Sequence, residues 1–538
     1  MSLPPDTERN EKTIARHGRT SQSLFILIAI AFVLARLWRL TSSCLWFDEI
    51  FSVHAARHTW ADLVKFAAAD IIHPPLFYAL LKIWIAIGGE SILWLRLLPF
   101  LFSVATIIPF ALLCRELDLR SAETNLALLL MAVSGFQIKY AQEVRMYSPL
   151  LLLSVVSIWV FLRFLKYSTA RKHLVTLTAT NLLLVYTHYY GWVLVAVEGL
   201  IMLISRRKQL IKFLLSVAVL LVAYVPWIYE VAVSREPGRG VAQNLGWIPR
   251  PGFRDVLQFF LVASKPFLFT QSSVDRVYDA LSLWAVLLLI ATPLSLFIWQ
   301  TFRARRERQA ETSLILLALT PLVIAFALSW TFPYPVWGTR HLIICAAPLA
   351  IVSAAAICRL QANWIRIAVS VMFGCWILFA AMIFVVKPAQ QFTWCTWEGL
   401  VEGGGSSSNR RLEMQSSGDQ PAAKPPIYVF EDLVAYHIWF AGTQNGRQPN
   451  NVTVIKGVPG LCEDPAFFLP RRFDEIKVGD TSQIKGDYIW VAFRAPRWDE
   501  NRPPLNLLKS LGYERTLIES TSAQGEKSFL VALRKTKT

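Results

Sequence analysis

Charged residues are few in this chain of 538 residues: they make up 17% of it, whereas hydrophobic residues make up 54%. A soluble domain usually contains about 25% charged residues. The shortage excludes a disordered or fibrous protein and argues against a wholly soluble enzyme. Acidic residues are the scarcer kind, with 37 Asp and Glu against 54 Lys and Arg. The composition therefore favours a membrane protein.

Motifs of several common enzyme classes are also missing. The sequence has no G-x-x-x-x-G-K-[ST] loop, so nucleotide-driven transport is not supported, and no G-x-S-x-G or H-E-x-x-H motif of a hydrolase. Its 7 cysteines form no C-x-x-C pair and show no metal-ligand spacing. If the C-terminal tail faces an oxidising space, a disulfide between Cys395 and Cys462 is one alternative.

The basic residues are unevenly distributed. Residues 388–538 carry 18 basic and 17 acidic side chains, so nearly all of the net charge of +17 lies in the first 387 residues. There the basic residues form short clusters between apolar runs, at 163–172, 206–212, 303–308 and 359–366. This pattern is typical of cytoplasmic loops in membrane proteins and not of one basic face on a polar domain. We therefore expect no nucleic-acid partner.

About twelve apolar segments are long enough, or nearly so, for the roughly 20 residues that span a bilayer. The first, 22–40, runs directly into Arg36-Leu-Trp-Arg39 with no cleavage site, so we expect a retained membrane helix after a cytoplasmic tail, residues 1–21. The other segments lie near 74–88, 94–114, 121–138, 144–165, 173–188, 189–205, 210–230, 279–300, 312–331, 341–358 and 364–386.

The basic clusters also predict which connections lie outside the cytoplasm. These are the loops 41–73, 139–145, 187–191, 231–278 and 332–340, together with the tail. A cytoplasmic N-terminus and an external tail require an odd number of crossings, so one segment within 74–138 either does not cross or is split in two. We therefore expect a mainly α, multi-pass domain over 22–386 with about 11–13 transmembrane helices. The amphipathic loop 41–73 suits two interfacial helices.

The composition changes after Lys387. Residues 387–426 include Gly-Gly-Gly-Ser-Ser-Ser and Lys-Pro-Pro, which indicates a flexible linker. Beyond it, short β-branched and aromatic runs alternate with helical patterns. We predict a small α/β domain over 427–538, outside the membrane.

Two adjacent carboxylates, Asp48 and Glu49, follow the first membrane helix in the first external loop. Burial at the membrane boundary would raise the pKa of a carboxylate toward a value useful for proton abstraction. The alternative is a solvated helix N-terminus, where acidic residues are favoured by the helix dipole. The residues alone leave both interpretations open.

Other polar residues map to the same external face. They are His73, Arg96, Glu143, Arg145, Tyr147, His188, Arg340 and His341. Some of these motifs have a simpler interpretation: the prolines after His73 can mark a helix start, and the tyrosines can belong to the aromatic belt of a membrane. Arginine, however, can bind a phosphate through two hydrogen bonds, and an isolated arginine at membrane depth is costly. Together the set suggests a site for an anionic, lipid-linked substrate.

Three motifs in order carry a family resemblance: Trp46-Phe-Asp48-Glu49, His73-Pro-Pro-Leu-Phe-Tyr and Arg96-Leu-Leu-Pro. They resemble the bacterial glycosyltransferase family 39 group, the dolichyl-phosphate-mannose protein mannosyltransferase-like branch of the GT-C superfamily. The segments 140–147 and 186–189 look like motifs of one bacterial subgroup. The resemblance covers about residues 24–360. It implies a GT-C membrane domain, and an external C-terminal domain fits the same family.

The resemblance implies an inverting glycosyltransferase of the bacterial cytoplasmic (inner) membrane. Such an enzyme moves a sugar from a polyprenyl-phosphate donor to a hydroxyl of a lipid, glycan or protein on the external face. By analogy Asp48 is the catalytic base, and Glu49 orients the acceptor or helps to hold a divalent cation. The metal question stays open, and no other cofactor is expected.

One position departs from the family pattern. His73 stands where lipid A-modifying relatives usually carry Lys, so Arg145 and Arg340, which stay protonated, become the safer candidates for binding phosphate. Two other functions remain as alternatives: a transporter or flippase of lipid-linked sugars that forms no glycosidic bond, and a ligase that moves a whole oligosaccharide.

Overall fold

In the computed structural model, the chain forms two compact units. The helical unit comprises Met1–Leu40, Ile71–Trp84 and Leu93–Pro388, and the mixed unit comprises Thr41–Asp70, Ile85–Ile92 and Ala389–Thr538. The structure describes residues 5–167, 171–234, 248–268, 276–303, 309–386, 395–401, 426–443, 451–458, 473, 475–523 and 526–536. Most of the predicted linker 387–426 and part of the predicted external loop 231–278 lie outside these residues.

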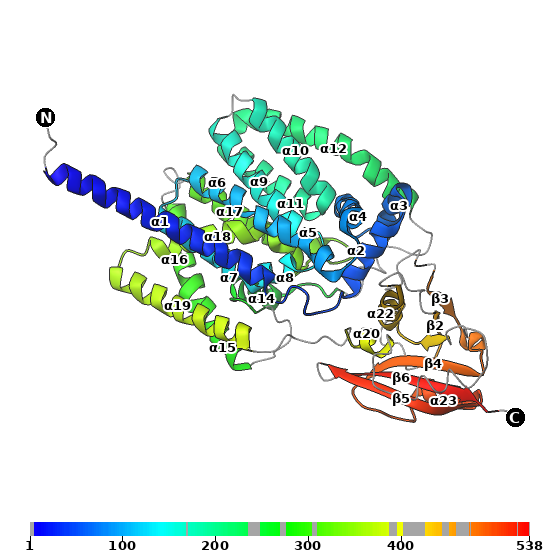
Figure 1. The fold of residues 1–538 in the computed structure, drawn as a ribbon. Helices are drawn as coiled ribbons and strands as arrows, with labels where there is room; N and C mark the ends of the chain where they lie inside the picture. Colours follow the sequence, from blue (N-terminus) through cyan, green and yellow to red (C-terminus); the bar gives the residue numbers. More distant parts are fainter. Residues whose placement is uncertain are drawn as a thin grey trace. The chain divides into compact units, whose positions relative to one another are not determined.

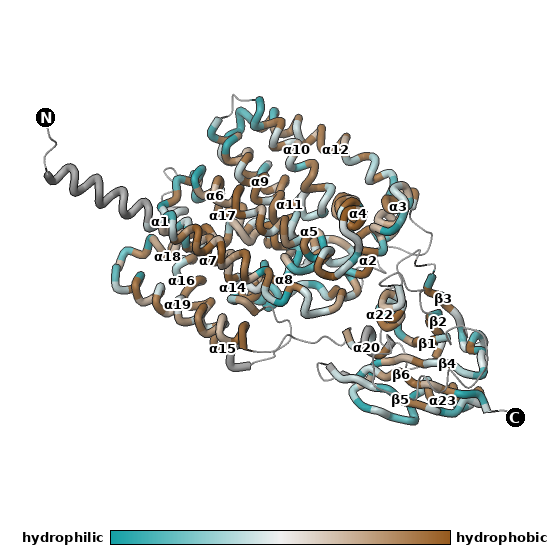
Figure 2. The backbone as a smooth tube through the Cα atoms, in the orientation of Figure 1, coloured by the Kyte–Doolittle hydropathy of each residue, from teal (hydrophilic) through white to brown (hydrophobic). Residues whose placement is uncertain are grey.

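The helical unit consists of apolar helices, and many of them are brown over much of their length in Figure 2. Figure 1 labels most of them. They are α1 (Pro5–Leu37), α4 (Leu76–Gly88), α5 (Ile92–Ala105), α6 (Ile107–Glu116), α7 (Ser121–Val133), α8 (Gly135–Ala141), α9 (Tyr147–Lys166), α10 (Arg171–Thr187), α11 (Tyr190–Ser205), η1 (Arg207–Gln209), α12 (Leu210–Val233), α14 (Phe253–Ser264), α15 (Arg276–Ala285), η2 (Val286–Ala291), α16 (Thr292–Arg303), α17 (Gln309–Thr331), η3 (Thr339–Cys345), α18 (Ala346–Cys358) and α19 (Asn363–Val386).

Among the described residues, 8 helical stretches are long and apolar enough to cross a bilayer. They are Thr20–Leu37, Ile92–Glu116, Tyr147–Lys166, Arg207–Val233, Ala280–Thr301, Gln309–Thr331, Thr339–Cys358 and Asn363–Val386. Three shorter apolar helices, α4, α7 and α11, accompany them. This architecture confirms the predicted mainly α, multi-pass membrane protein.

The ambiguous region 74–138 contains a helix break that hydropathy does not reveal. The single segment expected over 121–138 is two helices, α7 and α8, with Ser134 between them. At the break the N–H of Phe267 donates a hydrogen bond to the carbonyl of Val133 at 2.6 Å. A Cβ on Gly135 would lie 2.7 Å from the backbone of Leu268, so only glycine allows this close approach. Because apolar residues flank the break on both sides, periodicity alone predicts one helix.

A buried arginine ties α1 to the C-terminal end of α7. The guanidinium of Arg36, which is 0% exposed, donates to the carbonyls of Met131 at 3.0 Å and Ala132 at 3.2 Å. It also donates to the hydroxyl of Ser103 on α5 at 2.9 Å. The last carbonyls of a helix lack partners within the helix and carry the negative end of its dipole. These acceptors explain how a cation is accommodated inside a membrane helix.

A second buried polar group joins α9, α10 and α11. The Oγ of Ser157 lies 2.6 Å from Oδ1 of Asn181 and 2.6 Å from Oε1 of Glu198. The Nδ2 of Asn181 donates to Oε2 of Glu198 at 2.8 Å. A hydroxyl has one proton and an amide oxygen only accepts, so Ser157 donates to Asn181 and Glu198 must donate to Ser157. If the oxygen and nitrogen of the Asn181 amide are exchanged, the amide oxygen faces Oε2 of Glu198, and a proton on Glu198 is again required. Glu198 is therefore a neutral carboxylic acid in either orientation of the amide.

We expect Glu198→Gln to preserve stability, because a neutral amide can replace the protonated carboxyl in this network. Glu198→Ala should lower the free energy of unfolding by about 1–3 kcal/mol, since it leaves buried polar groups without partners. Thermal unfolding of the purified protein in detergent measures both variants. Equal damage by the two substitutions would show that the carboxyl is charged instead.

The mixed unit contains a 6-stranded sheet in the order β3-β2-β1-β4-β6-β5 (Figure 1). Strands β3, β2, β1 and β4 pair in parallel, whereas β6 pairs antiparallel with both β4 and β5. The strands are β1 (Ile427–Val429), β2 (Val452–Ile455), β3 (Lys477–Gly479), β4 (Tyr488–Ala495), β5 (Tyr513–Ala523) and β6 (Glu526–Lys535), and the helices of this part are α20 (Thr396–Val401), α22 (Asp432–Thr443) and α23 (Pro503–Ser510). This confirms the predicted small α/β domain.

The two short helices predicted in the first loop also exist, as α2 (Phe47–Arg57) and α3 (Trp60–Asp70). They belong to the mixed unit, although the sequence-based limits assigned 41–73 to the membrane domain. The ring of Phe47 packs 4.8 Å from that of Tyr436 on α22, centroid to centroid. Arg57 donates to Glu90 at 3.0 Å and to the hydroxyl of Thr443 at 3.2 Å. Such contacts between distant segments leave no mark on the local pattern.

A disulfide fixes the first loop to the tail. It joins Cys44 to Cys395, which are 351 residues apart in the sequence. The pairing of Cys395 with Cys462 considered from the sequence is therefore wrong, because a cysteine forms one disulfide at a time; Cys462 lies outside the described residues. Sequence alone could not identify the partner, because spacing does not determine connectivity.

Peptide mapping of the unreduced protein tests this connectivity. We expect mass spectrometry to find the peptide containing Cys44 joined to the peptide containing Cys395, and Cys44→Ser to abolish that species. Reduction before digestion is the control, since it should release both peptides. A linked Cys395–Cys462 peptide in the native protein would contradict the structure.

Candidate functional site

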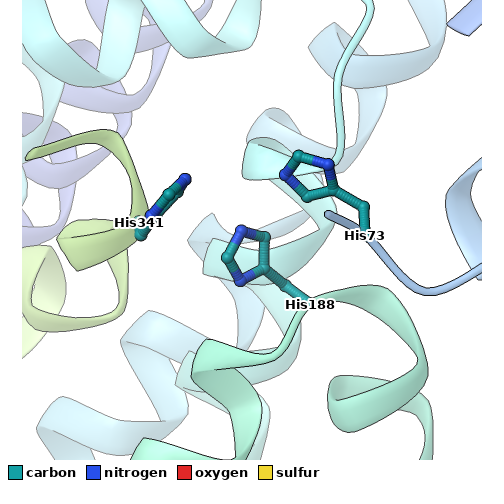
Figure 3. Close-up of side chains that lie close together, drawn as sticks. All are labelled: His73, His188 and His341. Atoms are coloured by element: carbon teal, nitrogen blue, oxygen red, sulfur yellow. The ribbon is translucent and has the colours of Figure 1, made fainter. Parts of the chain in front are cut away.

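Three histidines from separate parts of the helical unit meet at one point (Figure 3). His73 precedes α4, His188 lies between α10 and α11, and His341 is in η3. One ring nitrogen from each lies within 4.8 Å of those from the other two. His73 is 1% exposed and His188 is 2% exposed. The structure thus brings together three residues that the sequence had only assigned to a common membrane face.

Arg145 determines which nitrogen of His73 carries the proton. An Nη2 of Arg145 lies 3.2 Å from Nδ1 of His73, and the hydroxyl of Tyr78 lies 3.5 Å from Nη1. A guanidinium only donates hydrogen bonds, so Nδ1 of His73 must accept. The proton of the neutral imidazole is then on Nε2.

The same reasoning applies to His188. The backbone N–H of Tyr190 donates to Nδ1 of His188 at 3.0 Å, so the neutral ring again carries its proton on Nε2. Within the described part of the chain, Nε2 of His73 and Nε2 of His188 are buried and have no hydrogen-bond partner. Buried polar atoms are normally paired. Two buried N–H groups of the cluster thus lack an acceptor.

A divalent cation fits this cluster poorly. A histidine that binds a metal through Nε2 must have its lone pair there and usually donates its Nδ1–H to an acceptor. In His73 and His188 the Nδ1 atom faces a donor instead. The nearby positive charge of Arg145 also disfavours a cation. The donors of this cluster suit an anion, such as a phosphate oxygen.

Burial and charge keep these imidazoles neutral. Burial, and after it the charges of Arg145 and Arg340, lower the pKa of His188 to about 3. Burial is also the main cause that lowers the pKa of His73 well below its ordinary value, and the charge of Arg145 adds to it. Both histidines therefore act as neutral N–H donors near pH 7, in agreement with the hydrogen bonds.

Tyr147 and Arg340 lie on the border of the histidine cluster. The ring of Tyr147 is 6.3 Å from that of His188 and 6.3 Å from that of His341, and the guanidinium carbon of Arg340 is 6.0 Å from the Tyr147 ring centroid. A Cβ on Gly338 would come within 2.5 Å of Nδ1 of His341. Glycine at this position therefore gives the His341 ring its space.

Two other expected site residues make contacts of a different kind. Glu143 forms an ion pair with Lys139 at 3.0 Å, one helical turn earlier in the sequence. Arg96 is buried on α5 and donates to the carbonyl of Leu40 at 2.8 Å, where the chain leaves α1. These contacts give both residues a part in holding the backbone around the site.

The acidic pair begins α2 in the mixed unit. A carboxylate oxygen of Glu49 accepts a hydrogen bond from the backbone N–H of Trp46 at 3.1 Å. This is half of a capping box, so Glu49 stabilises the start of the helix. Asp48, half-buried, is the neighbouring residue in the same first turn. The hydrogen bond thus gives Glu49 a structural function at the start of α2.

The expected site residues did not include three residues that support the cluster, Tyr78, Tyr190 and Gly338, although Tyr78 ends the motif His73-Pro-Pro-Leu-Phe-Tyr. Tyr78 is 0% exposed beside Arg145, and Tyr190 places its backbone N–H on His188 and its hydroxyl on the carbonyl of Val336. Each lies within a few residues of an expected site residue. Their adjacency was a usable signal, although aromatic residues at membrane boundaries are common for other reasons.

The chain shares its overall fold with ArnT from Cupriavidus metallidurans, as two comparisons show. The structure of ArnT from Cupriavidus metallidurans bound to undecaprenyl phosphate matches 95% of this chain and 97% of its own, with a TM-score of 0.56 and 13% identity. The apo state of ArnT matches 96% of this chain and 98% of its own, with a TM-score of 0.56 and 14% identity. At this identity the likeness shows the fold alone, and it confirms the predicted fold class.

A more distant neighbour is the oligosaccharyltransferase of Archaeoglobus fulgidus tethered with an acceptor peptide. It matches 78% of this chain with a TM-score of 0.47 and 14% identity, and the match spans 63% of that enzyme's length. No protein-family model and no curated protein sequence match the chain.

Substitutions at His188 distinguish an anion site from a metal site. We expect His188→Gln, which keeps an N–H donor near Nε2, to bind inorganic phosphate within about threefold of the native protein, whereas His188→Leu should bind about tenfold more weakly, since one hydrogen bond to a charged group is lost. Equilibrium binding of radiolabelled phosphate to the protein in detergent measures both. Tight binding of Zn²⁺ that either substitution abolishes would contradict the anion assignment.

Proposed function

We propose that this protein is an inverting membrane glycosyltransferase of the family 39 type. It transfers a sugar from a polyprenyl-phosphate donor to an acceptor hydroxyl of a lipid, glycan or protein at the external face of the bacterial inner membrane. The observation that carries the proposal is the buried cluster of neutral histidine N–H donors beside Arg145 in a GT-C membrane domain. The ArnT structure bound to undecaprenyl phosphate supports the same class of lipid.

The cluster suits the leaving group of this reaction. As the bond between the anomeric carbon and the phosphate oxygen breaks, negative charge develops on the phosphate. Donors fixed in position before the reaction stabilise such charge with little reorganisation. His73 and His188 would donate through Nε2, while Arg145 and Arg340 supply positive charge. Tyr147 and His341 would line the donor-binding region beside them.

Asp48 is the proposed catalytic base. It removes the proton of the acceptor hydroxyl while the oxygen attacks the anomeric carbon from the side opposite the phosphate. The new glycosidic bond forms, the bond to phosphate breaks with its electron pair on the phosphate oxygen, and polyprenyl phosphate leaves. The disulfide at Cys44 and the cap made by Glu49 hold the helix that carries this base.

The membrane orientation completes the proposal. The N-terminus is on the cytoplasmic side, and the basic clusters between apolar segments agree with this direction. The C-terminal α/β domain is then external, where an oxidising space permits the disulfide. A polyprenyl chain would lie among the apolar helices, which supply the hydrophobic surroundings that it needs.

Replacing the base tests the reaction directly. We expect Asp48→Asn to reduce transfer from a labelled polyprenyl-phosphate sugar by about 10²–10⁴-fold, the usual range for losing general base catalysis. Binding of the donor should stay close to native, because the substitution removes the proton acceptor and leaves the helical unit unchanged. Product formation is followed by chromatography of the glycosylated acceptor.

Asp62→Asn is the matched control, because Asp62 is a half-buried acidic residue in the first turn of α3, as Asp48 is in the first turn of α2. It should leave the transfer rate within about twofold, since Asp62 takes no part in the proposed reaction. Full activity of Asp48→Asn would remove Asp48 from the base position. Movement of the labelled lipid across vesicles with no new glycosidic bond in the native protein would instead support a flippase.

A further inference from the structure

A second polar region of the helical unit plays no part in the proposed reaction. It is a cavity of about 410 Å³ between the C-terminal ends of α6 and α9. Pockets that hold small molecules or headgroups are commonly about 300–1,000 Å³. The cavity is lined by Leu112, Arg115, Glu116, Trp159, Arg163, Lys166 and Tyr167.

The cavity lies at the opposite end of α9 from the histidine cluster. Helix α9 begins with Tyr147 beside the cluster and ends with Lys166 in the cavity, 20 residues in all. At 1.5 Å per residue this helix is about 30 Å long, the thickness of the hydrocarbon core of a bilayer. The cavity is therefore at the level of the lipid headgroups on the other face of the membrane.

Positive charge exceeds negative charge in this cavity. Three cations, Arg115, Arg163 and Lys166, meet two carboxylates here. Glu116 lies 3.4 Å from the Lys166 amine and 3.8 Å from Nε of Arg163, and Asp118, beside the cavity, lies 4.0 Å from the Lys166 amine. All three distances are longer than a good charged hydrogen bond. Within the described part of the chain, Nε of Arg163 and Oε1 of Glu116 are buried and make no hydrogen bond. The three cations therefore leave the cavity with a net positive charge that suits an anion.

An apolar path leads from the cavity into the membrane. Ile108 and Leu112 precede Glu116 on α6 by eight and four residues, so they lie on the same face of the helix. Ile108 is 68% exposed. The ring of Trp159 lies 5.6 Å from the guanidinium carbon of Arg163, at the depth where membrane proteins favour tryptophan. An occupant that extends along this path needs both an anionic group and an apolar chain.

We propose that this cavity binds the headgroup of an anionic phospholipid, with an acyl chain lying along the exposed face of α6. Basic pockets between transmembrane helices bind such headgroups on the cytoplasmic side, which is the side that the topology assigns to Arg163 and Lys166. A free phosphate would use the same cations but not the apolar face. The site is separate from the donor site and holds one phospholipid molecule at the surface of the helical unit.

Native mass spectrometry of the full-length protein in detergent tests the site with phosphatidylglycerol and phosphatidylcholine as probes. We expect retention of phosphatidylglycerol over phosphatidylcholine. The double variant Arg163→Gln/Lys166→Gln should bind phosphatidylglycerol about 30-fold more weakly, as expected for two basic residues near a membrane surface. Arg206→Gln/Lys208→Gln is the matched control, because it removes two exposed charges at another turn and should bind normally.

Glu116→Gln gives an effect of opposite sign. Removing the competing carboxylate should tighten phosphatidylglycerol binding several-fold, a result that a misfolded variant would not produce. Equal losses in the cavity variant and in the control would overturn the proposal, since they would indicate general charge attraction. Displacement of the lipid by millimolar inorganic phosphate would also overturn it, because it would identify a site for free anions.

Discussion

A guanidinium group cannot accept a hydrogen bond, and this limits the chemistry of the whole site. Where Arg145 contacts His73, the imidazole must accept the hydrogen bond at Nδ1, so its own proton is on Nε2, on the other side of the ring. The backbone of Tyr190 imposes the same tautomer on His188. Three histidines close together suggest a metal centre at first sight. However, Nδ1 of His73 and Nδ1 of His188 both accept hydrogen bonds, so the cluster presents N–H donors and suits an anion.

The helices around the histidine cluster are stabilised by hydrogen bonds between their buried polar groups. Arg36 on α1 donates hydrogen bonds to the last carbonyls of α7, and Arg96 donates to the carbonyl of Leu40, just after α1. Glu198 is held by Ser157 and Asn181 deep between three helices. Because each of these groups has partners in a medium without water, the helices that carry the histidines are fixed before a ligand arrives.

The architecture followed largely from the sequence, because apolar segments and basic clusters report directly on the bilayer. The helix break at Ser134 and the bond between Cys44 and Cys395 did not, since both depend on contacts between distant segments. For the site, the sequence identified His73, Arg145 and His188 by residue type and membrane face. It could not show which nitrogen donates, because a tautomer is set by neighbours in space such as Tyr190.

The same limit applies to the acidic pair. Asp48 and Glu49 stand side by side in the sequence, and only the family resemblance gave them different functions. In the structure the hydrogen bond from the backbone of Trp46 shows that Glu49 caps α2. Such a structural function depends on a contact that the local pattern alone does not identify.

The most direct test of an anion site at His73, His188 and Arg145 is a cryo-electron microscopy structure of the full chain with a polyprenyl phosphate. We expect a phosphate oxygen about 3 Å from Nε2 of both His73 and His188. A metal ion bonded to these two nitrogens, or a phosphate bound away from Arg145 with the cluster empty, would contradict the account.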